Sequence, residues 1–103
     1  MNTTTIQQNI IEDFEILEDD FEMTLNYLME LGEKLEEYEE KNKIDENIVK
    51  GCQSKVWLSY DLKDGKLFFS GDSNTSITKG LLSLLIKVFS GQTPEDILDT
   101  KLF

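Results

Sequence analysis

Residues 54–71, SKVWLSYDLKDGKLFFSG, hold two short alternating runs that flank a turn. The apolar positions of each run recur every second residue and so share one face of a strand: Val56, Leu58, Tyr60 and Leu62 in the first run, Leu67 and Phe69 in the second. Lys63-Asp64-Gly65 lies between them, and an Asp-Gly pair tolerates the positive φ angles of a tight turn. The stretch therefore predicts a β-hairpin. Two strands alone are marginally stable, so we expect helices, with or without a third strand, to cover it.

Helical periodicity flanks this hairpin on both sides. Residues 3–17 predict a first helix, capped by a threonine among residues 3–5. Residues 21–35 predict a second helix, which is capped by Asp19 or Asp20 and for which Gly32 is a candidate stop. Residues 77–89 are apolar nearly all round, which is typical of a central core helix, and Gly80 within them indicates a close backbone approach. Residues 93–96, Thr-Pro-Glu-Asp, predict the start of a short last helix. The order α-α-β-β-α-α predicts that residues 1–103 form one α+β domain.

Composition excludes several classes of function. The chain carries 21 acidic residues against 10 basic ones, all of them Lys, for a net charge of −11. This balance opposes binding to nucleic acid and to anionic lipid. The absence of His excludes Ser-His-Asp catalysis and His-ligated metal sites within this chain, and a single Cys excludes an internal disulfide or a Cys-x-x-Cys pair. No run is long enough to span a bilayer and the N-terminus does not resemble a signal peptide, so we expect a cytoplasmic protein.

Two acidic stretches have competing interpretations. Residues 33–47 are densely charged and form either a solvated surface or an acidic docking face for a basic partner. Asp72-x-Asn74-x-Ser76 has the oxygen spacing of a calcium loop, but Ile77 stands where that loop needs Gly, and the closing Glu is missing. We therefore expect no metal site there.

Cys52 is the remaining candidate for chemistry. Gly51 gives the backbone freedom to turn before it, and Gln53 and Ser54 offer hydrogen bonds after it. Lys50 and Lys55 flank it in an otherwise acidic chain, and positive charge favours the reactive thiolate. A lone cysteine can also be a small buried apolar residue, so both interpretations stay open on these grounds.

The run Gly51-Cys52-Gln53-Ser54-Lys55-Val56-Trp57 resembles the SufE-type proteins, also called Fe-S metabolism associated or cysteine desulfuration proteins. Their signature Gly-Cys-x-Ser-x-Val-Trp is matched at every fixed position. Further segments match in order and spacing: Gly71-Asp72-Ser73, Ile77, Lys79-Gly80-Leu81 and Thr93-Pro94-Glu95-Asp96-Ile97, and more weakly Tyr27 with Glu30-Leu31-Gly32 and Leu35. The resemblance covers nearly the whole chain and implies the fold that SufE-like proteins share with IscU-type scaffolds.

The resemblance also implies an activity. A SufS-type cysteine desulfurase, which itself carries pyridoxal phosphate, would hand persulfide sulfur to Cys52. This chain would then pass the sulfur to an Fe-S scaffold of the SufBCD type and so stimulate the desulfurase. It would be a sulfurtransferase-like accessory protein with no cofactor of its own. One Cys and no His are too few to ligate a cluster, which favours a sulfur carrier over a scaffold.

The neighbouring motif residues have expected supporting roles. We expect Gly51, Gln53 and Ser54 to support the cysteine loop, and Trp57 either to pack in the hairpin or to shield the persulfide. Asp72 and Ser73 are expected to cap the central helix. Lys79 either reaches solvent along an apolar helix or takes part in function.

Two alternatives to the sulfur carrier follow from the same sequence. SufE-like chains usually continue past the position of Phe103 into a helical segment with a Ser-Pro-x-Arg-type motif, so this chain could be a truncated, inactive paralogue. It could also be a non-catalytic acidic interaction module in which Cys52 is structural.

Overall fold

A two-stranded antiparallel hairpin forms the base of the molecule. In the computed structural model, which describes residues 2–51 and 53–101, β1 (Val56–Lys63) pairs with β2 (Lys66–Ser73). Asp64 and Gly65 have φ angles of 54° and 77°, so the predicted Asp-Gly turn is confirmed. The described residues contain no third strand, although Ile48 forms an isolated antiparallel bridge with Trp57 at the outer edge of β1.

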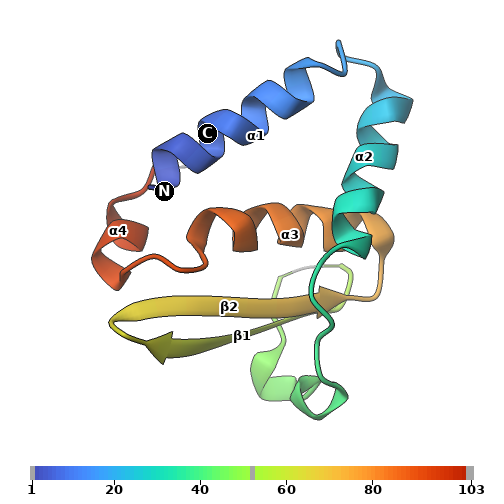
Figure 1. Ribbon diagram of the computed structural model, residues 1–103. Helices are drawn as coiled ribbons and strands as arrows, with labels where there is room; N and C mark the ends of the chain where they lie inside the picture. The colour runs from blue at the N-terminus through green and yellow to red at the C-terminus, as the bar shows by residue number, and fades with distance from the viewer. Residues whose placement is uncertain (1, 52, 102–103) are drawn as a thin grey trace.

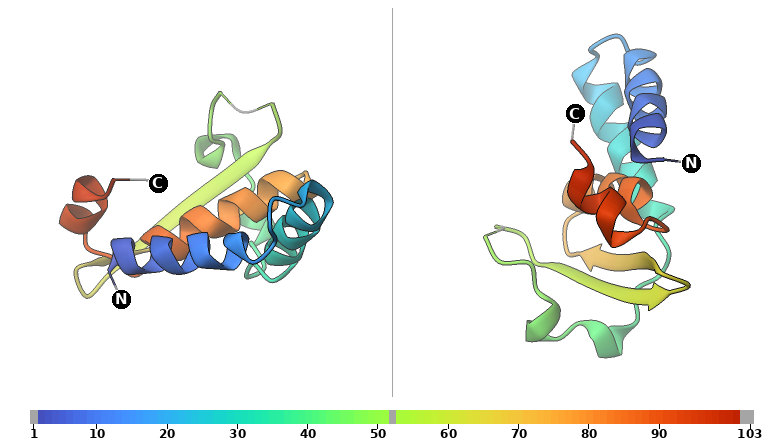
Figure 2. Two further views of the ribbon diagram at one scale, coloured as in Figure 1. Left: turned by 90° about the horizontal axis from the view of Figure 1, so that it is seen from above. Right: turned by 90° about the vertical axis from the view of Figure 1, so that its left-hand side faces the viewer.

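Four α-helices complete the fold: α1 (Thr3–Glu15), α2 (Phe21–Glu33), α3 (Ser76–Phe89) and α4 (Pro94–Asp99). Two short 3-10 helices, η1 (Glu40–Asn42) and η2 (Asp45–Asn47), lie in the charged stretch between α2 and the hairpin. The predicted α+β class and the order α-α-β-β-α-α are both confirmed. Figure 1 shows α3 as the middle layer, with the hairpin on one side and α1 and α2 on the other. The views in Figure 2 show the same layering from above and from one side.

Side-chain caps fix most of the helix starts. Asp20 Oδ1 accepts from the backbone N–H of Met23 at 3.0 Å, and Thr93 Oγ1 accepts from Asp96 at 3.2 Å, as predicted. The first helix is capped by Asn2 rather than by one of the three threonines, because its Oδ1 accepts from the N–H of Thr5 at 2.8 Å. The threonines lie instead in the first helical turn.

Two glycines set the contact between α2 and α3. A Cβ atom built on Gly80 would lie 2.1 Å from the carbonyl oxygen of Leu28, so the predicted close approach is confirmed. A Cβ on Gly32 would lie 2.9 Å from the backbone nitrogen of Gly80. Gly32 does not stop its helix, which continues to Glu33 with Lys34 as C-cap. Its lack of a side chain lets α2 rest directly on α3.

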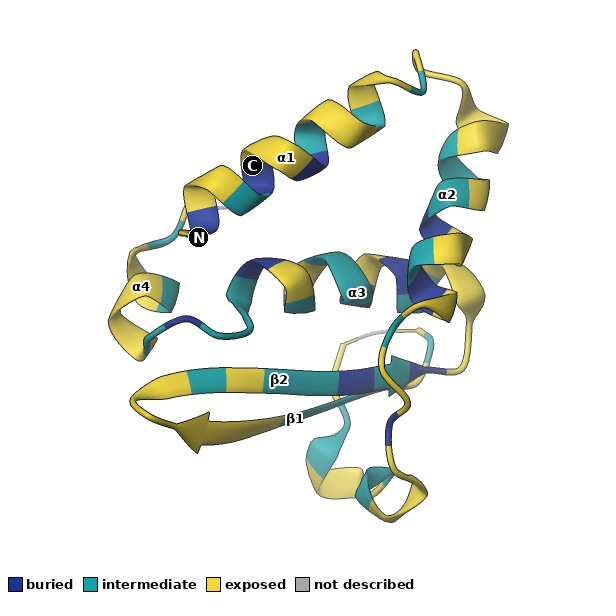
Figure 3. Cartoon of the chain, in the orientation of Figure 1, coloured by how far each residue is buried: buried dark blue, intermediate teal, exposed yellow. Residues whose placement is uncertain are grey.

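The hairpin is buried at one end only. Val56 is 5% exposed, whereas Tyr60 and Leu62 are 68% and 65% exposed. The expectation that all four alternating residues of β1 face a core is therefore wrong for the last two. Figure 3 shows the exposed turn end of the hairpin and the buried stretch of β2 near α3. The helices therefore cover the Val56 end of the hairpin, from which the cysteine loop emerges, and leave the turn end exposed.

The two ends of the described chain lie side by side. Thr100 Oγ1 donates to Thr3 Oγ1 at 2.8 Å, and Gln7 Nε2 donates to the backbone carbonyl of Lys101 at 3.1 Å. These contacts hold the C-terminal segment after α4 against α1. Among the described residues, no helix combines the length and apolar character that crossing a bilayer requires.

Candidate functional site

The cysteine loop leaves and re-enters the fold through a closed stem. The backbone N–H of Val49 donates to the carbonyl of Val56 at 2.8 Å, and Ile48 bridges to Trp57 next to it. Residues 50–51 and 53–55 therefore lie outside the pairing at the covered end of β1. Cys52 itself lies outside the described residues. Gly51 has a φ of +91°, a region that L-amino acids with side chains rarely adopt, and it has no neighbouring atom within 4 Å of a built Cβ.

The C-terminal half of this loop is tied to the segment that joins β2 to α3. Lys55 donates its N–H to Asn74 Oδ1 at 3.1 Å, and its carbonyl accepts from Ser73 Oγ at 2.9 Å. Ser54 Oγ accepts from Thr75 Oγ1 at 2.9 Å. The two motif segments noted in the sequence, around residues 51–57 and 71–81, are thus joined by hydrogen bonds. Gln53 is exposed, and it carries none of these anchoring contacts.

Asp72 and Ser73 do not cap α3, so that expectation is wrong. Both are the last residues of β2, and the N-cap of α3 is Thr75. The cause is strand pairing: Trp57 pairs with Asp72 and Val56 pairs with Ser73, so β2 extends to Ser73 and α3 starts later. Ser73 instead binds the loop at the Lys55 carbonyl. Asp72 instead forms ion pairs.

The Asp72 carboxylate joins two lysines from distant parts of the chain. Lys43 Nζ lies 3.1 Å from Asp72 Oδ2, and Lys79 Nζ lies 3.3 Å from Oδ1. The Lys79 contact is an ion pair rather than a directional hydrogen bond. Lys43 also pairs with Glu40 at 2.9 Å and lies 5.4 Å from the centre of the Trp57 ring. We call Lys43, Asp72 and Lys79 the carboxylate clamp.

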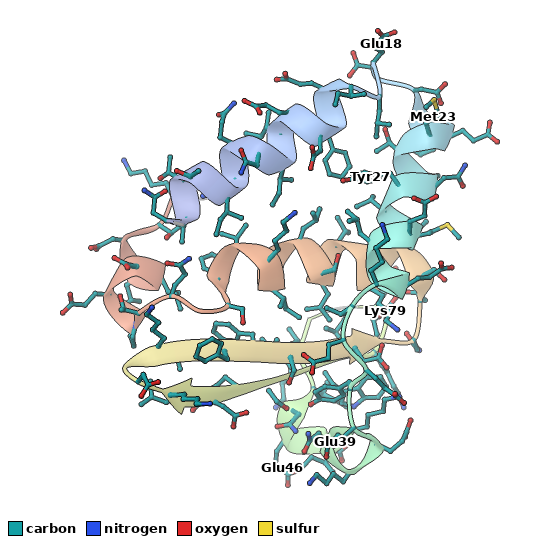
Figure 4. All side chains as sticks on the ribbon, viewed as in Figure 1. Glu18, Met23, Tyr27, Glu39, Glu46 and Lys79 are labelled. Carbon is teal, nitrogen blue, oxygen red and sulfur yellow. The ribbon has the colours of Figure 1, made fainter. Side chains whose placement is uncertain are left out.

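Electrostatics favour the charged form of the clamp. Burial raises the pKa of Asp72, but hydrogen bonds from Lys43 and the Ser73 backbone, together with the nearby positive charge of Lys79, outweigh this and leave the pKa below its ordinary value. Hydrogen bonds to Glu40 and then to Asp72 raise the pKa of Lys43. The clamp therefore holds the charged stretch, β2 and α3 together beneath the stem of the cysteine loop. Figure 4 labels Lys79 beside the C-terminal end of α2, where these elements meet.

Sequence reasoning assigned no role to Lys43 or Tyr38. Tyr38 is 6% exposed, and its hydroxyl contacts Ser59 Oγ and donates to the Asn42 carbonyl at 3.1 Å. A single aromatic residue in an acidic run was the available signal for a buried anchor. The predicted solvated surface is confirmed for the acidic side chains of this stretch, of which Glu39 and Glu46 are labelled in Figure 4, and for Lys34 and Lys41, but not for Tyr38 and Lys43.

Trp57 and Lys79 can now be placed. Trp57 is half-buried at the hairpin edge, where it forms a bridge with Ile48. The Lys43 ammonium group lies over the face of its ring. This position agrees with a packing role. Lys79 is half-buried and paired with Asp72 rather than extended into solvent.

Among the described residues, no group of three or more His, Cys, Asp or Glu side chains is arranged to hold a metal ion.

Comparison with known proteins decides the family. A model of the SufE family, the Fe-S metabolism associated domain, matches residues 8–103. The chain belongs to the SufE family. An uncharacterized SufE-like protein of Synechocystis is 44% identical over 72 residues, which are 70% of this chain and 45% of that protein. Uncharacterized SufE-like proteins of Rhizobium meliloti and Rhizobium etli are each 39% identical, over 91% and 85% of this chain and 69% and 62% of their own lengths.

Membership of the SufE family indicates a role in Fe-S metabolism. The matches span between about half and two-thirds of the relatives' own lengths. The family assignment over residues 8–103 confirms the resemblance that the motif segments indicated over nearly the whole chain.

Proposed function

We propose that this SufE-family chain accepts sulfur from a cysteine desulfurase on Cys52 and passes it to an Fe-S cluster scaffold. The observation that carries the proposal is the closed and anchored stem around the only cysteine. Val49 and Val56 close the loop, and Ser54 and Lys55 tie it to Ser73, Asn74 and Thr75. A reactive residue on a loop that a rigid scaffold positions is a common arrangement for chemistry between two proteins.

The transfer step needs only a thiolate on this chain. The Cys52 thiolate attacks the outer sulfur of the desulfurase persulfide, a new S–S bond forms, and the desulfurase thiolate leaves as the old S–S bond breaks. No external oxidant or reductant is consumed. A second cysteine nearby could expel the bound sulfur by forming a disulfide, and this chain contains one Cys only. The pyridoxal phosphate of the pathway resides in the desulfurase, and the proposed step requires no cofactor on this chain.

Charge on the loop supports the same role. Lys50 and Lys55 are both exposed and flank the cysteine, while the chain as a whole has a net charge of −11. Local positive charge favours the thiolate. These two lysines therefore bring local positive charge to both sides of the cysteine in an otherwise acidic chain.

Desulfurase turnover tests the proposal. Sulfide or alanine release by a SufS-type enzyme should rise when the wild-type chain is added and should stay at its basal rate with Cys52→Ser. Leu98→Ser, at a residue 85% exposed on α4, is the matched control and should stimulate like the wild type. Equal stimulation by Cys52→Ser, with both variants folded by circular dichroism, would refute the carrier role.

The alternative of a non-catalytic acidic module makes a different prediction. A structural Cys52 would resist alkylation by iodoacetamide until the protein unfolds, whereas a carrier thiol reacts in the folded state. Reaction rates in native buffer and in urea separate the two functions without any partner protein.

A further inference from the structure

A groove between α1 and α3 lies on the side of α3 that faces away from the hairpin (Figure 1). Its volume is about 410 Å³. Apolar side chains from three helices line it: Ile10, Ile11, Phe14, Leu28, Leu81 and Leu84. Leu81 is 50% exposed, although it lies in the middle of an otherwise apolar helix. The expectation that this helix is buried all round is therefore wrong on this face.

The part of the chain that contributes α1 and α2 is strongly acidic. Residues 1–33 contain no Lys and nine of the 21 acidic residues of the chain: Glu12, Asp13, Glu15, Glu18, Asp19, Asp20, Glu22, Glu30 and Glu33. Glu15 and Asp19 lie at the groove itself. Figure 4 labels Glu18 at the turn between the two helices, Met23 near the start of α2 and Tyr27 on the inner side of α2.

Tyr27 of α2 lies beside Phe14, one of the residues that line the groove. Tyr27 packs edge-on against Phe14, with ring centres 5.1 Å apart. Its pKa is raised, first by burial and then by the Asp13 carboxylate. The groove thus combines an apolar floor with two carboxylates, Glu15 and Asp19, as its charged lining residues. That combination selects a cationic ligand with an apolar face.

We propose that the α1–α3 groove binds an amphipathic helix of another protein, with Lys or Arg residues beside its apolar face. On α1 the lining residues run from Ile10 to Glu15, a wall about 8 Å long that matches between one and two turns of a bound helix. A second copy of this chain fits less well. It would bring a second Glu15 and Asp19 and a second net charge of −11 to the interface, and like charges placed opposite one another oppose association.

The groove is separate from the cysteine loop, so this proposal does not depend on sulfur transfer. The loop emerges from the hairpin on the other side of α3, and the groove residues take no part in its stem. Loss of groove binding and loss of desulfurase stimulation can therefore be observed independently.

Fluorescence anisotropy with three synthetic peptides of about 14 residues tests the proposal. The first is an amphipathic Leu/Lys helix, the second has the same composition scrambled so that Leu surrounds the helix, and the third replaces Lys by Glu. We expect the first to bind at least about tenfold more tightly than the second, and the third not to bind. Equal binding of the first two would indicate charge attraction alone and would overturn the proposal.

Matched variants of the full chain locate the binding. Leu81→Gln should weaken the first peptide at least about tenfold, because it places a polar group in the apolar floor. Leu98→Gln, at an exposed leucine of α4 outside the groove, should bind like the wild type. An unchanged affinity for Leu81→Gln would overturn the assignment. So would a concentration-dependent dimer, seen by sedimentation, that Leu81→Gln dissociates, because the occupant would then be a second copy.

Discussion

Replacing Gly80 by Ala should destabilise the fold, although Ala is the better helix former. In an exposed helix this change stabilises by about 1 kcal/mol. Here the new Cβ would lie 2.1 Å from the Leu28 carbonyl oxygen, and real Cβ atoms essentially never come within 3.0 Å of another heavy atom. The two helices must therefore separate by at least 0.9 Å, the difference between 3.0 Å and 2.1 Å. The Leu28 carbonyl oxygen is a backbone atom, so it cannot rotate out of the way as a side chain could.

The expected magnitude follows from two opposing terms. Overpacking in a close contact typically costs about 1–3 kcal/mol of stability. Because the new Cβ would meet rigid backbone rather than a side chain, we expect the upper end of this range, about 3 kcal/mol. Subtracting the helix-forming gain of about 1 kcal/mol leaves a net loss of about 2 kcal/mol in the free energy of unfolding. For a domain of this size the melting temperature would fall by about 10 °C.

Urea unfolding followed by circular dichroism measures this loss as a lower midpoint at unchanged slope. Gly32→Ala should lose less, because its Cβ would lie 2.9 Å from the nearest atom. Lys87→Ala, at an exposed position of the same helix, is the control and should change stability by less than about 0.5 kcal/mol. A Gly80→Ala variant as stable as the wild type would refute the account of how α2 packs on α3.

Three further predictions concern the cysteine-loop stem. Asp72→Asn should lower the free energy of unfolding by about 1–2 kcal/mol at neutral pH. Because the pKa of Asp72 lies below its ordinary value of 3.8, the difference from wild type should shrink as the pH falls below about 4. Urea melts that show the same difference at every pH would contradict this. Tyr38→Phe should cost about 1 kcal/mol in the same assay, whereas Tyr60→Phe, at a residue 68% exposed, should be neutral; equal losses would argue against the buried anchor. Gly51→Ala should cost about 1–2 kcal/mol through its φ of +91° alone, and no loss would mean that the loop adopts another backbone conformation.

Local signals in the sequence predicted most of the backbone. The Asp64-Gly65 turn, the Asp20 and Thr93 caps and the close approach at Gly80 each depend on one or two residues, and each is confirmed. Such features are set by backbone conformation and sterics, which a residue type reports directly.

Errors arose where tertiary contacts decide the outcome. Alternation predicted that Tyr60 and Leu62 face a core, but periodicity cannot show how far the covering helices reach. Asp72 has the composition of a cap, yet it continues β2 and binds Lys43, which is 29 positions earlier in the sequence. Neither the partner nor the strand register can be derived from the residue itself.

The candidate site was predicted in part. The motif around residues 51–57 identified the cysteine loop, and the second motif segment contained Ser73, one of the residues that anchor it, although Ser73 was expected to cap a helix. Asn74 and Thr75, which also anchor the loop, are not part of the matched motif. The role of the charged stretch could not be predicted, because Tyr38 and Lys43 acquire their contacts only when that stretch folds back along β1. The sulfur-accepting role of Cys52 remains a prediction, as Cys52 lies outside the described residues.

Intact-protein mass spectrometry tests the central claim most directly. The chain is incubated with a SufS-type desulfurase, pyridoxal phosphate and cysteine, and wild type is compared with Cys52→Ser. The account predicts that the wild-type chain gains the mass of one sulfur atom, that a reductant removes it, and that the Ser variant never gains it. A folded wild-type chain that acquires no sulfur from an active desulfurase would contradict the account.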